Sequence, residues 1–261
     1  MALTIKRTKG LSSPPMICVH GTSGVGKTTF ASQAPSPIFI QTEKGEGMLE
    51  IDTFDFGPQG VATGYDQVNE AVEPLLKTDH TFRTLVIDSL DHLEPLIWAY
   101  ICAKEKKETI DKFGYQEGYN TAALEWRVFL KRLAQLRSEK NMSIVLIAHN
   151  QQRKVDDPEY GQLDRHDLKL HPKSAGVVAE VVDCVFFAKH KINVRKEEKS
   201  FGATRNRGID TGERVLVTTG GPHYLAKNRY NLPNEINLNY SAFTSALAES
   251  KKPKQETVAN G

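Results

Sequence analysis

A glycine-rich stretch, GTSGVGKTT at residues 21–29, constrains the fold of this chain more than any other feature. It follows the short apolar run MICVH (16–20) and leads into GKTTFASQA, a helical segment that Pro35 should end. A strand, a glycine loop and a helix in this order aim several backbone N–H groups at one point beside a helix N-terminus. The stretch therefore predicts a phosphate-binding loop.

The spacing GxxxxGK[ST] also assigns roles within the loop. We expect Lys27 to reach the β- and γ-phosphates of a nucleoside triphosphate and to take part in catalysis, and the Thr28 hydroxyl to ligate Mg²⁺. ATP with Mg²⁺ is the expected ligand. The residues expected to surround it are Gly21, Thr22, Ser23, Gly24, Val25, Gly26, Lys27, Thr28 and Thr29.

Apolar runs and helical patterns alternate along the chain. The runs at 37–43, 84–89 and 143–149 are typical of buried strands, and helical spacing covers 68–76, 90–107 and 120–139. Such alternation predicts an α/β fold with a mostly parallel central sheet and helices on both faces. The helix over 120–139 is expected to bury its leucines and phenylalanine: Leu124, Phe129, Leu130, Leu133 and Leu136.

The last third of the chain departs from this pattern. Residues 150–172 are polar and too long for an ordinary connection, so we expect a functional or disordered loop there. VVDCVFFAKH and RVLVTT predict further strands in a C-terminal β-hairpin, and 240–248 a closing helix. We expect one domain over 1–248 and an unstructured tail over 249–261.

Carboxylates end two of the predicted strands. Asp88 closes LVID, where it is expected to hold the same Mg²⁺ as Thr28; the alternative is a helix N-cap at Asp88 or Ser89. Many ATPases place a glutamate directly after this aspartate, but Ser89 stands there. We therefore predict Glu43, at the end of the neighbouring strand, as the general base, with Glu46 or a plain surface turn as alternatives.

His149 and Asn150 end the strand SIVLIAHN. Polar groups at that edge are expected to contact the γ-phosphate and to transmit its presence to the segment behind them. A histidine with purely structural hydrogen bonds is the alternative.

Charge is unevenly distributed. The net charge of +2 does not predict a strong overall attraction to nucleic acid, but residues 189–229 hold ten Lys/Arg against four Asp/Glu. A solvated hairpin is the alternative explanation. With no leader and no apolar run near 20 residues, we expect a cytoplasmic protein that does not enter membranes. Three distant cysteines argue against a disulfide framework or a zinc site built on them.

These residues resemble the RecA-like ATPases. IQTE is similar to the strand that ends in the catalytic glutamate, LVIDS to the magnesium strand followed by serine, and LIAHNQQRK to the strand that ends in a phosphate-sensing amide before a DNA-binding loop. Over residues 14–235 the chain resembles more closely the phage single-strand annealing proteins, AAA-type ATP-binding proteins built on a minimal RecA-like core. A RecA-like P-loop NTPase core is the fold that this resemblance implies.

The element YLAKNR (224–229) is similar to the Lys-x-Arg element that RecA-like hexameric helicases insert into a neighbour's ATP site. By this resemblance Lys227 and Arg229 would act in trans as catalytic cations, within a ring or filament of identical subunits. Two exposed cations with no such role are the alternative.

The same resemblance places two DNA-binding loops, at 106–121 and 151–173. Acidic residues interrupt the second loop, and its sequence does not match the recombinase members, which argues against strand exchange. Bases would stack on aromatic rings and phosphates would pair with cations. The candidates are Tyr115, Tyr119, Arg153, Lys154, Arg165, Lys169 and Lys173.

The sequence thus predicts a DNA-stimulated ATPase of phage origin that binds single-stranded DNA in the bacterial cytoplasm and promotes annealing or homologous recombination. A single-stranded DNA-binding protein is an implied partner. The alternatives are a nucleotide-gated interaction module, such as a helicase loader, and a small-molecule P-loop kinase, which would need an acceptor pocket and an arginine-bearing lid.

Overall fold

A ten-stranded sheet organises the chain. The computed structural model describes residues 13–45, 47–198 and 204–252. In chain order the elements are β1 (Met16–Gly21), α1 (Lys27–Ser32), β2 (Pro37–Gln41), β3 (Asp52–Thr53), α2 (Tyr65–Lys77), β4 (Thr84–Asp88), α3 (Leu90–Lys104), α4 (Glu117–Glu139), β5 (Ser143–Asp157), β6 (Gly161–Leu168), α5 (Pro172–Val181), β7 (Cys184–Glu198), β8 (Thr204–Val217), β9 (Lys227–Asn228), β10 (Glu235–Asn237) and α6 (Tyr240–Ser250).

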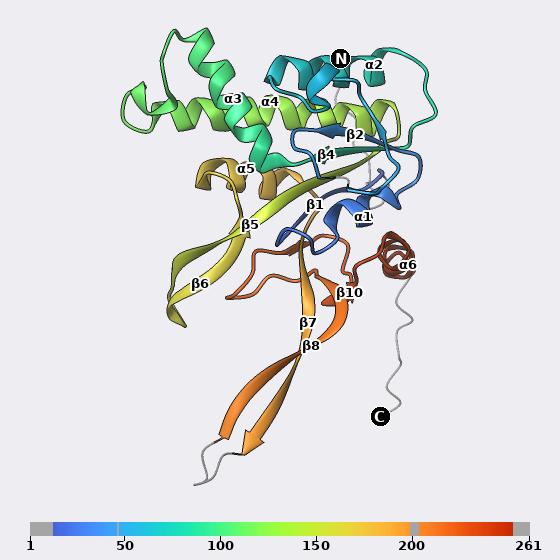
Figure 1. Cartoon of the computed structure of the whole chain (residues 1–261), viewed down its shortest axis with the longest axis vertical. Helices are drawn as coiled ribbons and strands as arrows, with labels where there is room; N and C mark the ends of the chain where they lie inside the picture. The colour runs from blue at the N-terminus through green and yellow to red at the C-terminus, as the bar shows by residue number, and fades with distance from the viewer. Residues whose placement is uncertain (1–12, 46, 199–203, 253–261) are drawn as a thin grey trace, which may run out of the picture.

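The strands follow the order β10-β8-β7-β1-β5-β4-β2-β3 (Figure 1). From β7 to β3 all neighbours are parallel, whereas β8 and β10 join antiparallel. The mostly parallel sheet predicted from the sequence is therefore confirmed. β5 lies between β1 and β4, so the strand that carries His149 separates the glycine loop from the strand that ends in Asp88.

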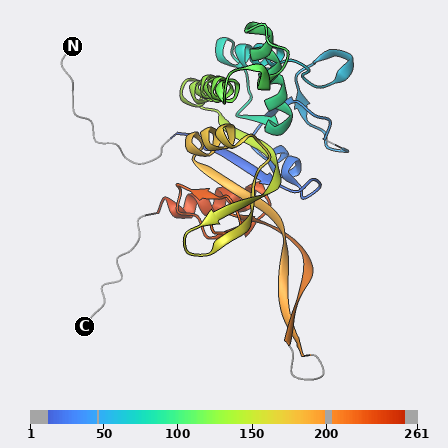
Figure 2. The same ribbon diagram turned by 90° about the vertical axis from the view of Figure 1, so that its left-hand side faces the viewer.

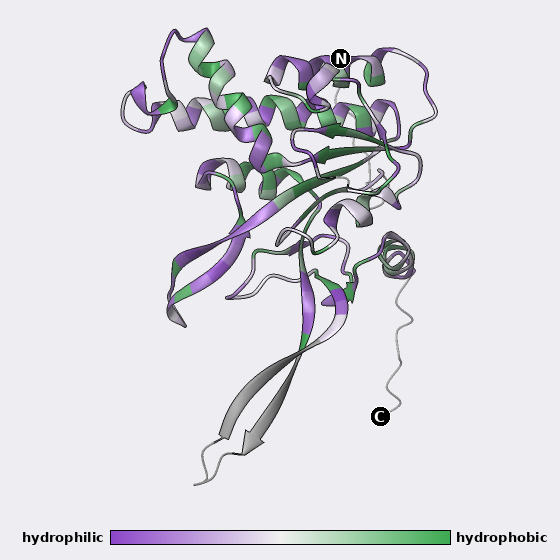
Figure 3. Cartoon of the chain, viewed as in Figure 1, coloured by the Kyte–Doolittle hydropathy of each residue, from purple (hydrophilic) through white to green (hydrophobic). Residues whose placement is uncertain are grey.

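Helices cover both faces of the sheet, also as predicted. α2, α3, α4 and α5 pack on one face, where Cys18 and Leu146 are buried. α1 and α6 pack on the other face, against Val19 and Val145. Successive strand residues point to opposite faces, so strands covered on both sides must be apolar throughout. Figure 3 shows these strands as hydrophobic, in contrast to the largely hydrophilic β5–β6 hairpin.

One core prediction was wrong. Leu124 in α4 is 63% exposed, whereas the other predicted core residues of that helix are buried. The buried face also includes Ala122 and Trp126. Leu124 follows Ala122 by two positions, about 200° around a helix of 3.6 residues per turn, so it points to the opposite side.

The predicted loop over 150–172 was also wrong. β5 continues past His149 to Asp157 and turns back into β6, forming an antiparallel hairpin in which Arg153 pairs with Arg165. A ribbon with polar residues on both faces lacks the apolar alternation by which a strand is recognised in a sequence.

Both hairpins continue core strands. β5 and β7 run parallel to β1, so β5–β6 and β7–β8 leave the sheet at its carboxyl edge, where β1 enters the glycine loop. The β7–β8 hairpin extends away from the body in both views (Figures 1 and 2). The hairpins touch at their bases, where the rings of His166 and Phe187 stack with centroids 5.0 Å apart.

Other predictions concern the C-terminal helix and tail, the three cysteines and the absence of a membrane-spanning segment. Helix α6 confirms the closing helix and extends to Ser250, and the tail beyond residue 252 lies outside the described residues. Cys18, Cys102 and Cys184 are free and buried. None of the described helices is at once long and apolar enough to cross a bilayer.

Candidate nucleotide site

The glycine loop joins β1 to α1 as the sequence predicts. Gly26, the residue before α1, has φ of 106°, in the left-handed region that favours glycine. Gly21 serves a different purpose, because a Cβ atom there would lie 2.4 Å from the carbonyl oxygen of Ala188 in β7. The two glycines therefore permit the turn of the loop and the close packing of β1 on β7.

Lys27 lies at the centre of the loop. Its Nζ donates to the carbonyl oxygens of Gly21 and Thr22, both at 3.0 Å. The side chain is 6% exposed, and this burial lowers the pKa of the ammonium group, against the pull of nearby carboxylates. A cation held in this way is placed to contact the phosphates that the loop N–H groups bind.

Thr28 and Asp88 meet at the foot of α1. The Thr28 hydroxyl donates to Oδ2 of Asp88 at 2.8 Å. Burial raises the pKa of Asp88 to about 6, and the hydrogen bond from Thr28 only partly opposes this effect. A hydroxyl and a buried carboxylate without full charge compensation form a donor set suited to Mg²⁺, so the pair fits the predicted role. Ser89 is the N-cap of α3, while Asp88 ends β4.

Hydrogen bonds of the preceding residue, Thr42, hold Glu43 near Thr28 and Asp88. β2 pairs with β4, and Thr42 continues the pairing: its N–H donates to the Asp88 carbonyl at 2.8 Å. The Thr42 hydroxyl donates to the Ser89 carbonyl at 2.7 Å and accepts from the Ser89 N–H at 2.9 Å. These bonds bring Glu43 to the cavity that the glycine loop lines. The alternative Glu46 lies outside the described residues.

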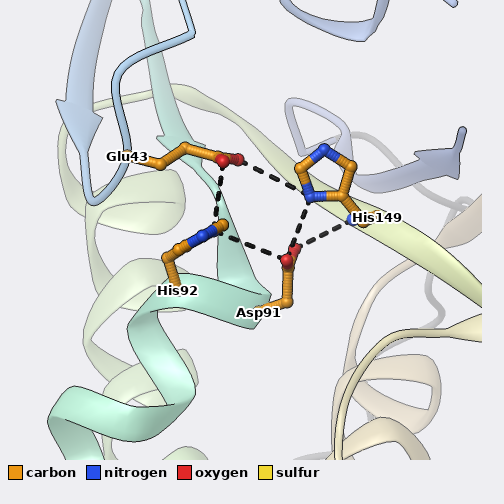
Figure 4. A group of neighbouring side chains, drawn as sticks. All are labelled: Glu43, Asp91, His92 and His149. Carbon is orange, nitrogen blue, oxygen red and sulfur yellow. Dashed lines mark hydrogen bonds and ion pairs between the residues drawn. The ribbon is translucent and has the colours of Figure 1, made fainter. Parts of the chain in front are cut away.

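Glu43, Asp91, His92 and His149 form a cluster of four side chains (Figure 4). Nδ1 of His149 lies 3.0 Å from Oδ2 of Asp91 and 3.7 Å from Oε1 of Glu43. Nδ1 of His92 lies 3.2 Å from Oε2 of Glu43 and 3.5 Å from Oδ2 of Asp91. Burial alone would raise the pKa of Asp91, but hydrogen bonds from the His149 side chain and backbone N–H hold it below its usual range. Each imidazole therefore faces two carboxylates.

His149 and Asn150 separate at the end of the core part of β5. His149 lines the nucleotide cavity, as its predicted contact with the γ-phosphate requires. Nδ2 of Asn150 instead lies 2.8 Å from Nδ1 of His166 in β6. Because adjacent residues of a strand point to opposite faces, only one of the two can face the nucleotide.

The cavity has a volume of about 410 Å³ and includes a residue that sequence reasoning missed. Arg214 of β8 lines it, with Nη1 3.1 Å from the position that a Cβ atom on Gly26 would take. Asp91 and His92 were missed as well. The basic character of residues 189–229 was visible in the sequence, but no motif singles out Arg214, because the pairing of β7 with β8 brings it to the loop.

Lys227 and Arg229 do not line this cavity of their own chain. Nζ of Lys227 donates to three carbonyl oxygens at the end of α5, those of Ala179, Glu180 and Val182, at 2.6–2.9 Å. Burial lowers the pKa of Lys227, as does the neighbouring Arg229. Arg229 donates to the Glu180 carbonyl at 3.1 Å but stays 47% exposed. Of the two, Arg229 is the cation that remains accessible to solvent, and a role in trans for either residue stays a prediction.

The two segments predicted to bind DNA lie against each other. Tyr119 stacks on His171 with ring centroids 4.0 Å apart, and Nζ of Lys173 donates to Oδ1 of Asn120 at 2.5 Å. Tyr119 also donates to Asp111 at 2.6 Å, so one face and the hydroxyl are already engaged. Tyr115 is 97% exposed and leaves its ring accessible.

The basic residues of the β5–β6 hairpin do not share one face. Arg153 and Arg165 pair across the strands and line a cavity against α5, whereas Lys154 points the other way and is exposed. Arg165 donates to Asp167 at 3.0 Å, and Arg153 donates to the Leu170 carbonyl. Nζ of Lys169, after the hairpin, lies 3.7 Å from Oδ2 of Asp91. The hairpin therefore presents alternating rather than continuous positive charge.

Comparison with known proteins agrees with this geometry. No curated protein matches the chain. The family model of an AAA domain matches residues 13–230, a span that contains the glycine loop, Asp88, Glu43 and His149. The match covers most of the chain and, with the parallel sheet and the loop, identifies a nucleotide-binding P-loop protein: the chain belongs to the AAA domain family.

Proposed function

We propose that this protein is an ATPase whose nucleotide state controls its binding of single-stranded DNA, and that it promotes strand annealing as a homo-oligomer. One observation carries the proposal. β5 runs without interruption from the nucleotide cavity, which His149 lines, into the hairpin that leaves the sheet. A change at the γ-phosphate thus acts on a strand whose far end projects beyond the ATPase core.

The charged and hydroxyl-bearing residues Lys27, Thr28, Glu43, Asp88 and Arg214 of the cavity each have a role in hydrolysis. The loop N–H groups and Lys27 hold the phosphates, and Arg214 adds a second positive charge beside Gly26. Thr28 and Asp88 hold Mg²⁺, which when bound neutralises charge on the phosphate oxygens. Glu43 orients the attacking water and accepts its proton. Because Glu43, at the end of the adjacent strand, supplies the base, no glutamate is needed directly after Asp88, where Ser89 stands.

Asp91 links this site to the segments proposed to bind DNA. It contacts His149 through both carboxylate oxygens, at 2.9 and 3.0 Å, and Lys169 at 3.7 Å. If His149 turns toward a γ-phosphate, its Nδ1 leaves Oδ2 of Asp91. The ion pair between Asp91 and Lys169, which uses the same oxygen, then changes. Lys169 is two residues from His171, which stacks on Tyr119. The nucleotide signal then reaches both segments.

DNA binding in this proposal uses the surface where those segments meet. Tyr115 supplies a free ring for base stacking, and Lys154 and Lys169 supply charge for phosphates. Stacking on rings is tolerant of sequence, as an annealing protein requires. A single-stranded DNA-binding protein is the proposed protein partner, because it coats the strands to be annealed.

The test is ATP hydrolysis with and without a long oligodeoxythymidine, at several salt concentrations. We expect stimulation by DNA in the wild type, none in Lys27→Ala, and a weaker, salt-sensitive response in Lys169→Ala. Lys131→Ala, which alters an exposed lysine on α4, is the matched control. Normal hydrolysis without any response to DNA would overturn the proposal.

Subunit cooperation is tested by mixing variants. Lys27→Ala removes the cation of a subunit's own glycine loop. Arg229→Ala removes the cation that the subunit is proposed to insert into its neighbour's site. In a homo-oligomer, mixing the two inactive proteins rebuilds complete sites where an intact loop meets an intact Arg229. Recovery of activity supports action in trans, and its absence at concentrations where the proteins associate argues against it.

A second candidate function is a nucleotide-gated module that binds a protein, such as a helicase loader. The tip of the β5–β6 hairpin favours it, because Asp156, Asp157 and Glu159 lie beside an exposed Tyr160. Acidic residues repel phosphates but suit a basic protein surface. If ATP binding is intact and bare DNA does not bind at any salt concentration, this second function gains support.

A further inference from the structure

We propose that Glu43, Asp91, His92 and His149 form a binding site for a transition-metal dication, with Zn²⁺ as the best match. The site is separate from the Mg²⁺ ligands Thr28 and Asp88. One donor atom from each of the four residues lies within 4.8 Å of all the others. The donors come from three places: the segment just after β2, the first turn of α3 and the end of the core part of β5 (Figure 4).

The distances between donor atoms suit such an ion. Zn²⁺ binds imidazole nitrogen and carboxylate oxygen at about 2.0–2.2 Å, which places neighbouring ligands of a tetrahedron about 3.3–3.6 Å apart. Both imidazoles lie near Oδ2 of Asp91, at 3.0 and 3.5 Å, and near Glu43, where His92 is 3.2 Å from Oε2 and His149 is 3.7 Å from Oε1. The remaining donor pairs are no more than 4.8 Å apart. To close the ring around an ion, the Glu43 and His92 side chains must rotate, and Nδ1 of His92 must leave the Ser89 hydroxyl, which lies 3.0 Å away.

Ligand chemistry separates this site from the Mg²⁺ site. Imidazole is a ligand for Zn²⁺ and similar ions, whereas Mg²⁺ prefers oxygen donors alone. Two carboxylates and two neutral imidazoles also balance a double positive charge. The nearest competing cation is Nζ of Lys169, 3.7 Å from Asp91, and its side chain is 55% exposed and can withdraw into solvent.

Asp91 is the fixed member of the site. It is almost fully buried, and its Oδ1 accepts the backbone N–H of His149 at 2.9 Å, while Oδ2 faces both imidazoles. Hydrogen bonds that orient a ligating carboxylate are typical of metal sites. His92 is the most exposed of the four, at 44%, and gives an ion a route from solvent.

Occupancy of this site has a consequence for the ATPase, and that consequence rests on the function proposed above. A Glu43 carboxylate bound to Zn²⁺ is no longer a base for water, and a His149 imidazole bound to it cannot turn toward a γ-phosphate. We therefore expect Zn²⁺ to inhibit hydrolysis while ATP remains bound, so that the metal acts as an inhibitor and not as a cofactor.

The first experiment needs no nucleotide. Zn²⁺ is titrated into the full-length protein by calorimetry, and Co²⁺ by visible absorption, where four-coordinate Co²⁺ gives intense bands. We expect one ion per chain, with affinity reduced at least about tenfold in His92→Ala and in Glu43→Gln. His223→Ala, which removes another exposed histidine, should bind like the wild type. Equal affinity in the wild type and His92→Ala, or no binding of one ion per chain, overturns the site.

The second experiment measures ATP hydrolysis at free Zn²⁺ concentrations fixed by a chelator buffer. For each protein the rate with Zn²⁺ is divided by the rate without it. We expect inhibition in the wild type and His223→Ala, and relief from it in His92→Ala. Stoichiometric binding without inhibition would retain the metal site and contradict the role of Glu43 as base. Failure of the metal site and failure of the proposed function therefore give different results.

Discussion

Replacing Asp88 by asparagine is expected to stabilise the nucleotide-free protein while abolishing Mg²⁺-dependent hydrolysis. Burial raises the pKa of Asp88 from 3.8 to about 6. Each pKa unit corresponds to about 1.36 kcal/mol, so the ionised carboxylate lowers the free energy of unfolding by about 3 kcal/mol at neutral pH. Asparagine carries no charge, and its Oδ1 can still accept the hydrogen bond from Thr28. We therefore expect Asp88→Asn to be about 3 kcal/mol more stable.

The pH dependence follows from the direction of the shift. Between pH 3.8 and about 6 the folded state binds more protons at Asp88 than the unfolded state does. The stability of the wild type attributable to this group therefore falls as pH rises through that window. Asparagine does not titrate. The advantage of Asp88→Asn should be complete above the window and absent below it.

Urea unfolding of both proteins in the absence of Mg²⁺ and nucleotide measures this difference. The transition is recorded at neutral pH and again near pH 3.8, the unfolded-state value. In a parallel series, Mg²⁺ and ATP should raise the urea midpoint of the wild type much more than that of the variant. A variant that is less stable at neutral pH, or a stability difference that does not change with pH, would refute the reasoning.

Three other outcomes follow from the contacts. Arg214→Ala should weaken ATP binding by about ten- to a hundredfold, because one charged contact is lost. Binding is measured with a fluorescent ATP analogue, and Lys191→Ala, on the paired strand, is the control. Asp183→Ala should lower the free energy of unfolding by about 3–5 kcal/mol, because Arg137, at 2.7 Å, loses its buried partner; an effect below 1 kcal/mol would contradict this. The three cysteines, buried and with raised pKa values, should react with a thiol reagent only after unfolding, and fast labelling of the native protein would argue against their burial.

The sequence alone predicted those features whose residues are close together in the chain. The glycine loop joins β1 to α1 within nine residues, so its spacing predicted the turn and placed Lys27 and Thr28 at the start of α1. Continuous apolar runs predicted the buried strands, because strands covered on both faces have no polar side. Asp88 and Glu43 were found by their places at the ends of such runs.

Sequence patterns failed where a segment lacks a single buried face. The β5–β6 hairpin was predicted as a loop because both of its faces are polar, and Leu124 was placed in the core because it is apolar and close in sequence to buried neighbours. Burial depends on direction as well as residue type. Only packing against a neighbouring element determines that direction.

The composition of the site was decided by the tertiary structure. Arg214 reaches the glycine loop because β7 pairs with both β1 and β8, and Asp91 and His92 reach Glu43 because β4 and β2 lie side by side. No local pattern encodes such contacts between residues far apart in the chain. The sequence by itself determined that a triphosphate loop would form at the end of a buried strand. The strand order decided which charges surround it, because parallel strands bring their carboxyl ends to one edge whatever their separation in the chain.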